Sequence, residues 1–144
     1  MAQTMQFDLV SPERMLLSAE ASAVSIPGAE GDLTAMPDHA PMITTLRPGI
    51  LSVETGTGTE QFVVTGGFAE IGNGLSVLAE RAMPAGDVDQ ATYEGLVDDA
   101  QAAYDAVKAS GGQDAGAVDD AAKLLADTVA IASAFGLSPK AAQL

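Results

Sequence analysis

The spacing of apolar residues changes at about residue 87, and this change constrains the fold more than any other feature of the sequence. Before it, short segments alternate between apolar and polar residues, as at residues 5–10, where Phe7 and Leu9 share one face. After it, apolar residues recur at steps of three and four. The 144 residues are therefore expected to form a β-rich domain at 1–86 and a helical domain at 87–144.

The β-rich part consists of many short strand-like segments separated by turns that contain Gly and Pro. Strands are expected at residues 5–10, 16–21, 23–26, 32–36, 42–46, 50–54, 61–65, 68–71 and 75–79. Closely spaced short strands of this kind are typical of an antiparallel sandwich or barrel.

Glycine pairs mark two hairpins and one irregularity among these strands. The turns Gly56-Thr57-Gly58 and Gly72-Asn73-Gly74 are expected to supply the positive φ angles that a tight hairpin needs. The dipeptide Gly66-Gly67 interrupts a strand pattern and predicts a bulge or a close approach of two backbones.

The last 58 or so residues predict an antiparallel hairpin of two amphipathic helices. The first apolar stripe comprises Tyr93, Leu96, Val97, Ala100, Ala103, Tyr104 and Val107, and the second Val118, Ala121, Ala122, Leu125, Val129, Ala132 and Phe135. Capping and breaking residues indicate the ends of the helices. The caps at the N-termini are Asp87 or Asp89 and then Asp114 or one of its neighbours, and the breakers at the C-termini are Gly111-Gly112 and then Gly136 with Pro139. The fold class is thus α+β.

The charge of the chain excludes several classes of partner. Twenty acidic residues face six Lys and Arg, and the formal net charge is −14, so nucleic acid and anionic membrane surfaces are repelled. Cysteine is absent, which excludes disulfides and thiolate metal sites. No apolar run approaches the ~20 residues needed to span a bilayer, and the first residues lack the pattern of a signal peptide. We expect a cytoplasmic protein with no direct membrane insertion.

Residues that could carry catalysis are sparse. The single histidine, His39, has no nucleophile motif and no second imidazole to make a metal site. The carboxylate pairs Asp98-Asp99 and Asp119-Asp120 point about 100° apart on a helix. The glycines at 56–58 lack the Lys-Ser/Thr of a phosphate-binding loop. We expect no catalytic residues, no metal, no nucleotide and no cofactor, which favours a binding or structural role.

Six segments follow one another between residues 7 and 80: FDLVSPE at 7–13, PGAEGDL at 27–33, MPDHAPM at 36–42, LRPG at 46–49, TGGFAEI at 65–71 and VLAE at 77–80. In this order and spacing, they resemble the epsilon subunit of bacterial F-type ATP synthases. The resemblance implies a β-sandwich of about ten strands followed by the helical hairpin. It also implies a non-catalytic rotor subunit of the central stalk, peripheral at the cytoplasmic face of the inner membrane, that binds the gamma subunit and the c-ring and couples proton flow to ATP synthesis.

The resemblance assigns contact residues on the sandwich. Glu30, Gly31 and Asp32 match the family's acidic loop that faces the c-ring, whose loops present basic and polar side chains. The positions expected to face gamma are Ser11, His39 and Thr44.

The helical part departs from the family's pattern in two respects. Some members bind ATP through Ile/Leu-Asp-x-x-Arg-Ala, whereas residues 88–93 read VDQATY, with Thr92 in place of the arginine. Some members also inhibit ATP hydrolysis by placing basic helices against the beta subunit, whereas residues 87–144 hold ten acids and three lysines. The chain is therefore expected to bind ATP weakly or not at all, and to inhibit through a contact with the beta subunit weakly or not at all.

Two other readings compete with the rotor subunit. One is a free-standing β-sandwich adaptor that binds an unrelated basic partner. The other is a small hydrolase or lyase built around His39, against which the missing nucleophile and metal ligands count. Association with gamma separates the rotor subunit from the adaptor, and the effect of His39→Ala on any activity tests the enzyme.

Overall fold

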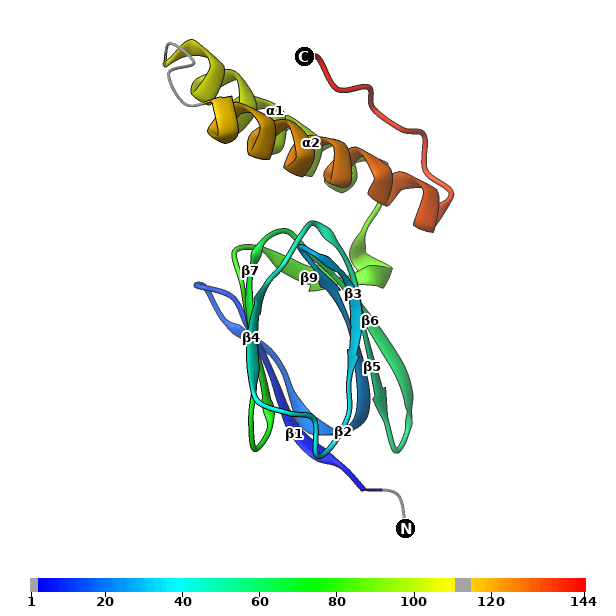
Figure 1. The fold of residues 1–144 in the computed structure, drawn as a ribbon. Coiled ribbons are helices and arrows are strands. Elements are labelled where there is room, and N and C mark those ends of the chain that lie inside the picture. The colour runs from blue at the N-terminus through cyan, green and yellow to red at the C-terminus, as the bar shows by residue number, and fades with distance from the viewer. Residues whose placement is uncertain (1–2, 111–114) are drawn as a thin grey trace. The chain divides into compact units, whose positions relative to one another are not determined.

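The chain forms two compact units, residues 1–87 and residues 88–144, seen in the ribbon of Figure 1. The computed structural model describes residues 3–110 and 115–144. The first unit contains the strands β1 (Met5–Val10), β2 (Met15–Gly28), β3 (Gly31–Ala35), β4 (Met42–Thr45), β5 (Gly49–Thr55), β6 (Gly58–Val64), β7 (Gly67–Ile71), β8 (Leu75–Ala79) and β9 (Ala82–Pro84), then the 3-10 helix η1 (Ala85–Asp87). The second unit contains the helices α1 (Gln90–Ala109) and α2 (Ala115–Phe135).

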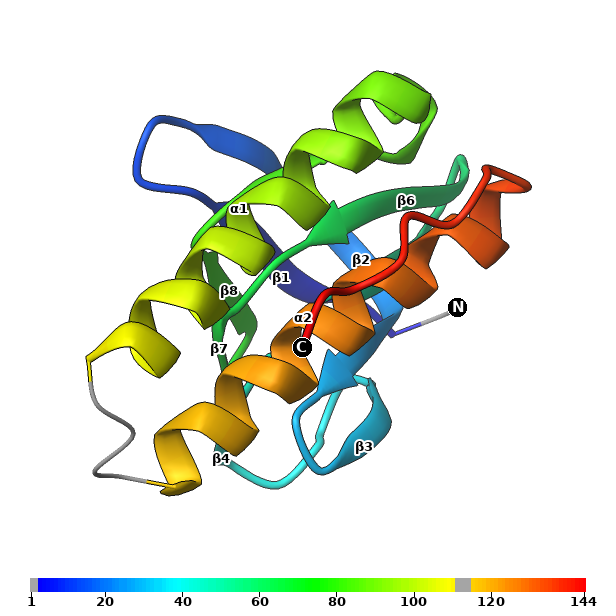
Figure 2. The same ribbon diagram turned by 90° about the horizontal axis from the view of Figure 1, so that it is seen from above.

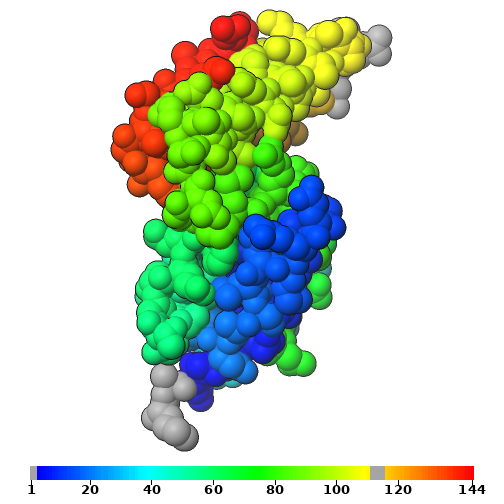
Figure 3. Space-filling view, turned by 180° about the vertical axis from the view of Figure 1, so that it is seen from behind, coloured from blue at the N-terminus to red at the C-terminus, as the bar shows by residue number. Residues whose placement is uncertain are grey.

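The strands of the first unit form one hydrogen-bonded sheet that folds over into a sandwich (Figure 1). The order is β4-β7-β8-β1-β2-β5-β6-β9, with β3 also paired to β2. Seen from the other side in Figure 3, the first strands (blue) lie beside β5 and β6 (teal), as this order requires. The predicted β-sandwich is confirmed. Every pairing is antiparallel except that of β1 with β8, which is parallel.

The long strand β2 is the element that joins the two layers. Two separate strands were expected over its length, at 16–21 and 23–26, but the structure has one strand of 14 residues. Its pairing with β5 shifts register between Ala21 and Ala23, and the hydroxyl of Ser22 donates to Glu54 O at 3.3 Å. This bulge bends the strand, so that its first half pairs with β1 and its second half with β3 and β5.

The sandwich core is built mainly by alternation along the strands, although β6 buries the three successive residues Phe62, Val63 and Val64. Phe7 and Leu9 of β1 are fully buried, as predicted, together with Ile26, Leu51 and Val77 from the strands around them. A fully buried side chain of this size contributes about 1.5–3 kcal/mol through loss of apolar surface from water. The core therefore fixes which face of each strand looks outward.

The glycines act in different ways from one another. Gly66 and Gly67 have φ of 98° and 105°, and a Cβ on Gly67 would lie 1.9 Å from Leu78 O, so the predicted close approach is confirmed. The hairpin at Gly72-Asn73-Gly74 is present, but the expected positive φ angles are wrong. Gly74 is needed there because a Cβ would lie 2.7 Å from Gln6 O of the neighbouring strand.

The second unit is a helical hairpin, which Figure 2 shows with its two helices side by side. Asp89 caps α1 by accepting a bond from Thr92 N at 2.8 Å, as expected of one of the two candidate aspartates. Gly136, with φ of 65°, ends α2 as predicted. The expected breaker Gly111-Gly112 and cap Asp114 lie outside the described residues.

The helix–helix interface largely follows the predicted stripes. Tyr93, Leu96, Val97 and Tyr104 of α1 are buried, whereas Ala103 is exposed, contrary to expectation. On α2, Leu125 and Ala132 are buried as expected, and the stripe also includes Thr128 and Ile131, which the spacing had not indicated. Thr128 satisfies its hydroxyl by donating to Leu124 O at 2.7 Å, so it can be buried at little cost.

Candidate functional site

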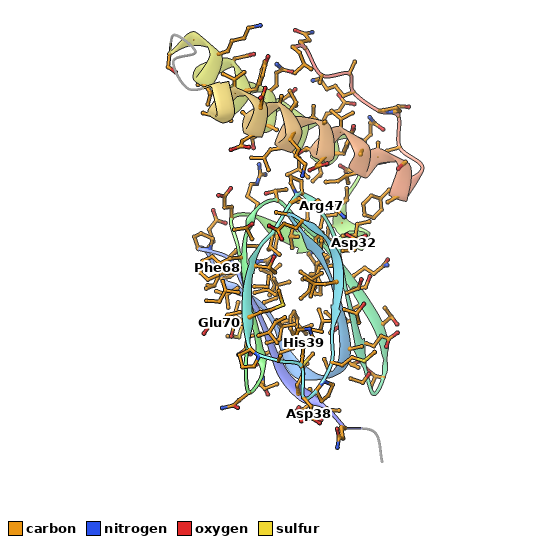
Figure 4. The ribbon with its side chains drawn as sticks, in the orientation of Figure 1. Asp32, Asp38, His39, Arg47, Phe68 and Glu70 are labelled. Carbon is orange, nitrogen blue, oxygen red and sulfur yellow. The ribbon has the colours of Figure 1, made fainter. Side chains whose placement is uncertain are left out.

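An apolar row crosses the outer face of four neighbouring strands of the sandwich. It comprises Phe68 on β7, Leu78 on β8, Val10 on β1 and Met15 on β2, and begins beside Thr45 on β4. Each member is the register partner of the next across the sheet. Phe68 and Leu78 are 40% and 42% exposed and Met15 is 57% exposed. Figure 4 shows Phe68 pointing away from the sandwich interior.

Strand alternation explains why these side chains face outward. In β7 the residues Ala69 and Ile71 are buried in the core. Because side chains alternate along a strand, Phe68 and Glu70 point to the solvent side of the sheet. In β8 the same side holds Ser76 and Leu78. The row was not among the expected sites, although a large apolar residue in the polar phase of two adjacent strands could have indicated it.

A polar row runs beside the apolar one, on the same face. Glu70, Ser76, Asp8 and Ser18 are successive register partners. The hydroxyl of Ser18 donates to Asp8 Oδ1 at 2.6 Å and Gln6 Nε2 donates to the same oxygen at 3.1 Å. These bonds hold the pKa of Asp8 below its usual value. The apolar row is thus bordered by a hydrogen-bonded, charged surface, the arrangement of a protein interface with a polar rim.

Of the three residues expected to face gamma, Ser11 adjoins the apolar row and Thr44 lies on the neighbouring edge strand β4. Ser11 directly follows Val10, and its N–H and hydroxyl both donate to Arg14 O, which closes the β1–β2 turn. Thr44 directly precedes Thr45 on the edge strand β4. Its side chain lies on the inner phase, with its hydroxyl 3.6 Å from where a Cβ on Gly28 would be.

The third expected residue, His39, lies in the connection between β3 and β4, off the apolar row. Its ring Nδ1 is 2.7 Å from Ala40 O, and its N–H donates to Met36 O at 3.1 Å. That second bond closes a turn in which Asp38 has φ of 69°. The imidazole is therefore engaged with the local backbone, and in Figure 4 it lies well apart from Phe68.

The acidic residues expected to face the c-ring form the tip of the β2–β3 hairpin. Ala29 and Glu30 are the two-residue loop between Gly28 and Gly31, and Glu30 is exposed. Asp32 forms an ion pair with Arg47, although the two are 15 residues apart in the chain. Figure 4 shows the two side chains meeting at one end of the sandwich.

Arg47 ties the base of this tip together. Its Nε donates to Gly28 O at 3.2 Å and its backbone N–H donates to Pro27 O at 2.9 Å, while its guanidinium pairs with Asp32. Its side chain is 28% exposed, against 71% for that of Asp32. The guanidinium thus neutralises one of the two acids and leaves Glu30 as the outward negative charge.

In the segment 88–93, Asp89 is the one residue that matches the family's ATP-binding motif, and here it caps the helix α1. The carboxylate of Asp89 accepts from Thr92 N, and this bond holds the pKa of Asp89 below its usual value. Tyr93 is fully buried, and its hydroxyl donates to Val129 O of α2 at 2.8 Å. Both side chains therefore belong to the helical hairpin.

Within residues 3–110 and 115–144, the structure holds no group of three His, Asp or Glu side chains that could ligate a metal ion. Neither of the two helices, over its described residues, combines the length and apolarity that a membrane crossing requires. A sandwich with an outward apolar row and an acidic, clamped hairpin tip, joined to a helical hairpin, defines a protein-binding module.

Comparison with known proteins places this module in a family. Residues 4–85 match the family model for the ATP synthase, Delta/Epsilon chain, beta-sandwich domain. The chain is 54% identical over 138 residues to the ATP synthase epsilon chain of Ruegeria sp. (strain TM1040), covering 95% of this chain and 100% of that one. Its identity to the ATP synthase epsilon chain of Rhodobacter capsulatus is 50% over 138 residues, with the same coverage.

A solved structure shares the fold. A chain of the Euglena gracilis mitochondrial ATP synthase, OSCP/F1/c-ring in rotational state 1, aligns with a TM-score of 0.67 at 22% identity, covering 94% of this chain and 82% of that one. The chain belongs to the ATP synthase delta/epsilon chain family. The resemblance expected from the sequence is confirmed, including its non-catalytic role.

Proposed function

We propose that this chain is a central-stalk rotor subunit of the bacterial F-type ATP synthase. It binds the gamma subunit through the apolar row and contacts the c-ring through the hairpin tip at Glu30. In this way it couples proton flow to ATP synthesis at the cytoplasmic face of the inner membrane, without entering the bilayer itself. Its relatives are named ATP synthase epsilon chains, and the observation that carries the proposal is the apolar row.

The apolar row supports a partner because large exposed apolar side chains normally stay scattered on a soluble protein. Here Phe68, Leu78, Val10 and Met15 are consecutive register partners, and Ile43, 68% exposed, lies on the same face of β4. An aromatic residue among aliphatic ones, bordered by polar groups, is the composition of an interface centre. Ser11, which directly follows Val10, then lies at the border of this surface, whereas the side chain of Thr44 lies on the opposite face of β4.

Binding of the full chain to recombinant gamma subunit tests this proposal. We expect a complex of micromolar affinity or tighter, measured by titration calorimetry. A chain that does not bind gamma, or that captures an unrelated basic protein instead, would favour the free-standing adaptor.

The contact with the c-ring is assigned to Glu30 rather than shared equally by Glu30 and Asp32. Asp32 already has a counter-ion in Arg47, so its charge is largely compensated within the chain. Glu30 projects from the two-residue loop, and Arg47 holds the base of that loop through Gly28 O. A basic loop of the c-ring would therefore be attracted mainly by Glu30.

Glu30→Lys is expected to weaken binding to the isolated c-ring by about three- to tenfold, the range for reversing one exposed charge at an interface. Asp32→Asn is expected to change that affinity less than Glu30→Lys. Glu60→Lys, the same charge reversal on β6, serves as the control. If Glu30→Lys and Glu60→Lys weaken c-ring binding equally, the effect comes from the net charge of the chain, and Glu30 is not the contact residue.

We further propose that the helical unit neither binds ATP strongly nor inhibits ATP hydrolysis strongly. The formal charge of residues 87–144 is −7, from ten acids and three lysines, which opposes approach to an acidic segment of the beta subunit. Asp89 is engaged as a helix cap and Thr92 stands where an arginine would meet phosphate. The hairpin is thus better suited to a structural role.

Deletion of residues 88–144 from the assembled ATP synthase is expected to raise ATP hydrolysis by less than about twofold, because helices that are repelled by the beta subunit inhibit it little. The measurement is the steady-state hydrolysis rate of the enzyme with the full chain and with the shortened one. Activation of tenfold or more would show that these helices inhibit.

A further inference from the structure

The residues after α2 run back along the helical hairpin as an extended segment (Figures 1 and 2). The helix ends in a Schellman turn, in which Gly136 has φ of 65° and Leu137 N donates to Ala132 O at 3.0 Å. Pro139 then prevents the helix from resuming. The sequence Gly-Leu-Ser-Pro at 136–139 therefore turns the chain sharply and releases it in a non-helical conformation.

Two glutamines of α1 bind this segment in the same way. Gln90 Nε2 donates to Ser138 O at 2.9 Å, and Gln90 Oε1 accepts from Ser138 N at 3.0 Å. Gln101 Nε2 donates to Gln143 O at 2.6 Å, and Gln101 Oε1 accepts from Gln143 N at 2.9 Å. Each side-chain amide thus pairs with the N–H and C=O of one residue, as a neighbouring β-strand would.

The spacing of the two bridges matches the geometry of both partners. Gln90 and Gln101 are 11 residues apart, about three helical turns, so they share one face of α1 about 16.5 Å apart at 1.5 Å per residue. Ser138 and Gln143 are five residues apart, which is also about 16.5 Å for a strand at 3.3 Å per residue. An extended segment in this register can satisfy both glutamines at once.

Further contacts lie between the two bridges. Lys140 N donates to the hydroxyl of Tyr93 at 3.1 Å, and that hydroxyl donates to Val129 O at 2.8 Å, so one buried side chain joins α1, α2 and the segment. Lys140 Nζ also pairs with Asp98. Each glutamine amide is oriented by a second bond, from Gln90 to Glu94 at 2.8 Å and from Gln101 to Asp105 at 3.0 Å.

We propose that this face of α1 is a binding surface for an extended peptide and that residues 138–143 of the same chain are its ligand. The bound segment acts as a strap that holds the end of α2 against α1, so separation of the two helices requires its release. The strap is recognised mainly through its backbone, because Gln90, Tyr93 and Gln101 all bond to main-chain atoms of the segment. Helix pairing in an alanine-rich hairpin gains from such a clamp, since alanine buries little apolar area.

Amide hydrogen exchange of the full chain, followed residue by residue by NMR, tests the strap. In the unmodified chain, the N–H groups of Ser138, Lys140 and Gln143 are expected to exchange at least about tenfold more slowly than in an unstructured peptide. The double variant Gln90→Met, Gln101→Met keeps side-chain length and helix propensity but removes both amides. It is expected to abolish protection at Ser138 and Gln143. Unprotected amides in the unmodified chain, or unchanged protection in the variant, would overturn the proposal.

Two further variants separate the strap from a general effect on the helices. Gln143→Met changes a strap side chain but no main-chain bond, so exchange at Gln143 is expected to stay within about twofold of the unmodified chain. A chain ending at Leu137 keeps the Schellman bond and loses the strap. Its α2 amides are expected to exchange about tenfold faster, and unchanged exchange there would show that the segment does not hold the hairpin closed.

Discussion

Gly67→Ala is expected to destabilise the sandwich by about 3–5 kcal/mol, the sum of backbone strain and steric overlap. Gly67 has φ of 105°, which a residue with a Cβ rarely adopts, and the new methyl group would start 1.9 Å from Leu78 O. Its neighbours within 3 Å are backbone atoms of Leu78 and Ala79 in the paired strand, so no side-chain movement relieves the clash. Because a domain of this size is stable by only about 5–15 kcal/mol, much of the folding free energy is lost.

Gly72→Ala is the matched control for this prediction. Gly72 lies in the hairpin that follows the same strand, its φ is not positive, and no atom lies within 4 Å of an added Cβ. Its replacement is expected to change the free energy of unfolding by less than about 1 kcal/mol. Urea unfolding followed by circular dichroism measures both variants. If both variants lose the same free energy of unfolding, the close backbone approach at Gly67 does not determine the stability of the sandwich.

These two glycines also show how far the sequence predicts the sandwich. Alternation of apolar and polar residues is a local property of the sequence. It therefore predicts where most strands lie and that residues such as Phe7 and Leu9 point into the core. The hairpin at residues 72–74 is also local and was predicted, but the function of its glycines was not. Position 74 requires a glycine because β1 lies too close to allow a Cβ there. The two come together because β1 and β8 pair in parallel. A contact between strands so far apart in the chain leaves no periodic signal.

The elements that prediction missed have similar causes. The strand β9 has three residues, too few to show alternation, and is held by pairing with β6. The bulge in β2 at Ser22 resembles a break between two strands, because one residue is out of phase. Ala103 was placed in the helical stripe by its spacing, but it is exposed, whereas its neighbour Tyr104 is buried.

The sequence likewise predicts only part of the candidate site. Motif resemblance indicated Glu30 and Asp32 together, since both are acids in one loop. Only the structure separates them, because the counter-ion Arg47 comes from the segment before β5. The apolar row is a property of register across four strands, so it emerges once pairing joins Phe68 to Leu78 and Leu78 to Val10. Each residue alone is an ordinary exposed apolar side chain.

Replacing Phe68 and Leu78 together by threonine is expected to weaken binding to the gamma subunit by at least about 100-fold, or 2.7 kcal/mol. The two residues are direct cross-strand partners at the centre of the apolar row. Threonine keeps the preference for strand and can form a cross-strand pair, so the sheet is retained while the apolar surface is lost. Since both side chains are already about two-fifths exposed, the free chain is expected to lose less than about 2 kcal/mol of stability.

The control for this variant is Met36→Thr, which removes an apolar side chain that is 55% exposed in the connection after β3, away from the row. It is expected to leave the affinity for gamma within about twofold, because an exposed residue outside an interface contributes nothing to binding. Calorimetric titration of gamma with each folded variant gives the comparison, with thermal unfolding of the free chains to correct for stability. If the Phe68, Leu78 variant binds as tightly as Met36→Thr, gamma is held by another surface. If both lose affinity equally, exposed apolar area in general, and not the register of the row, drives the association.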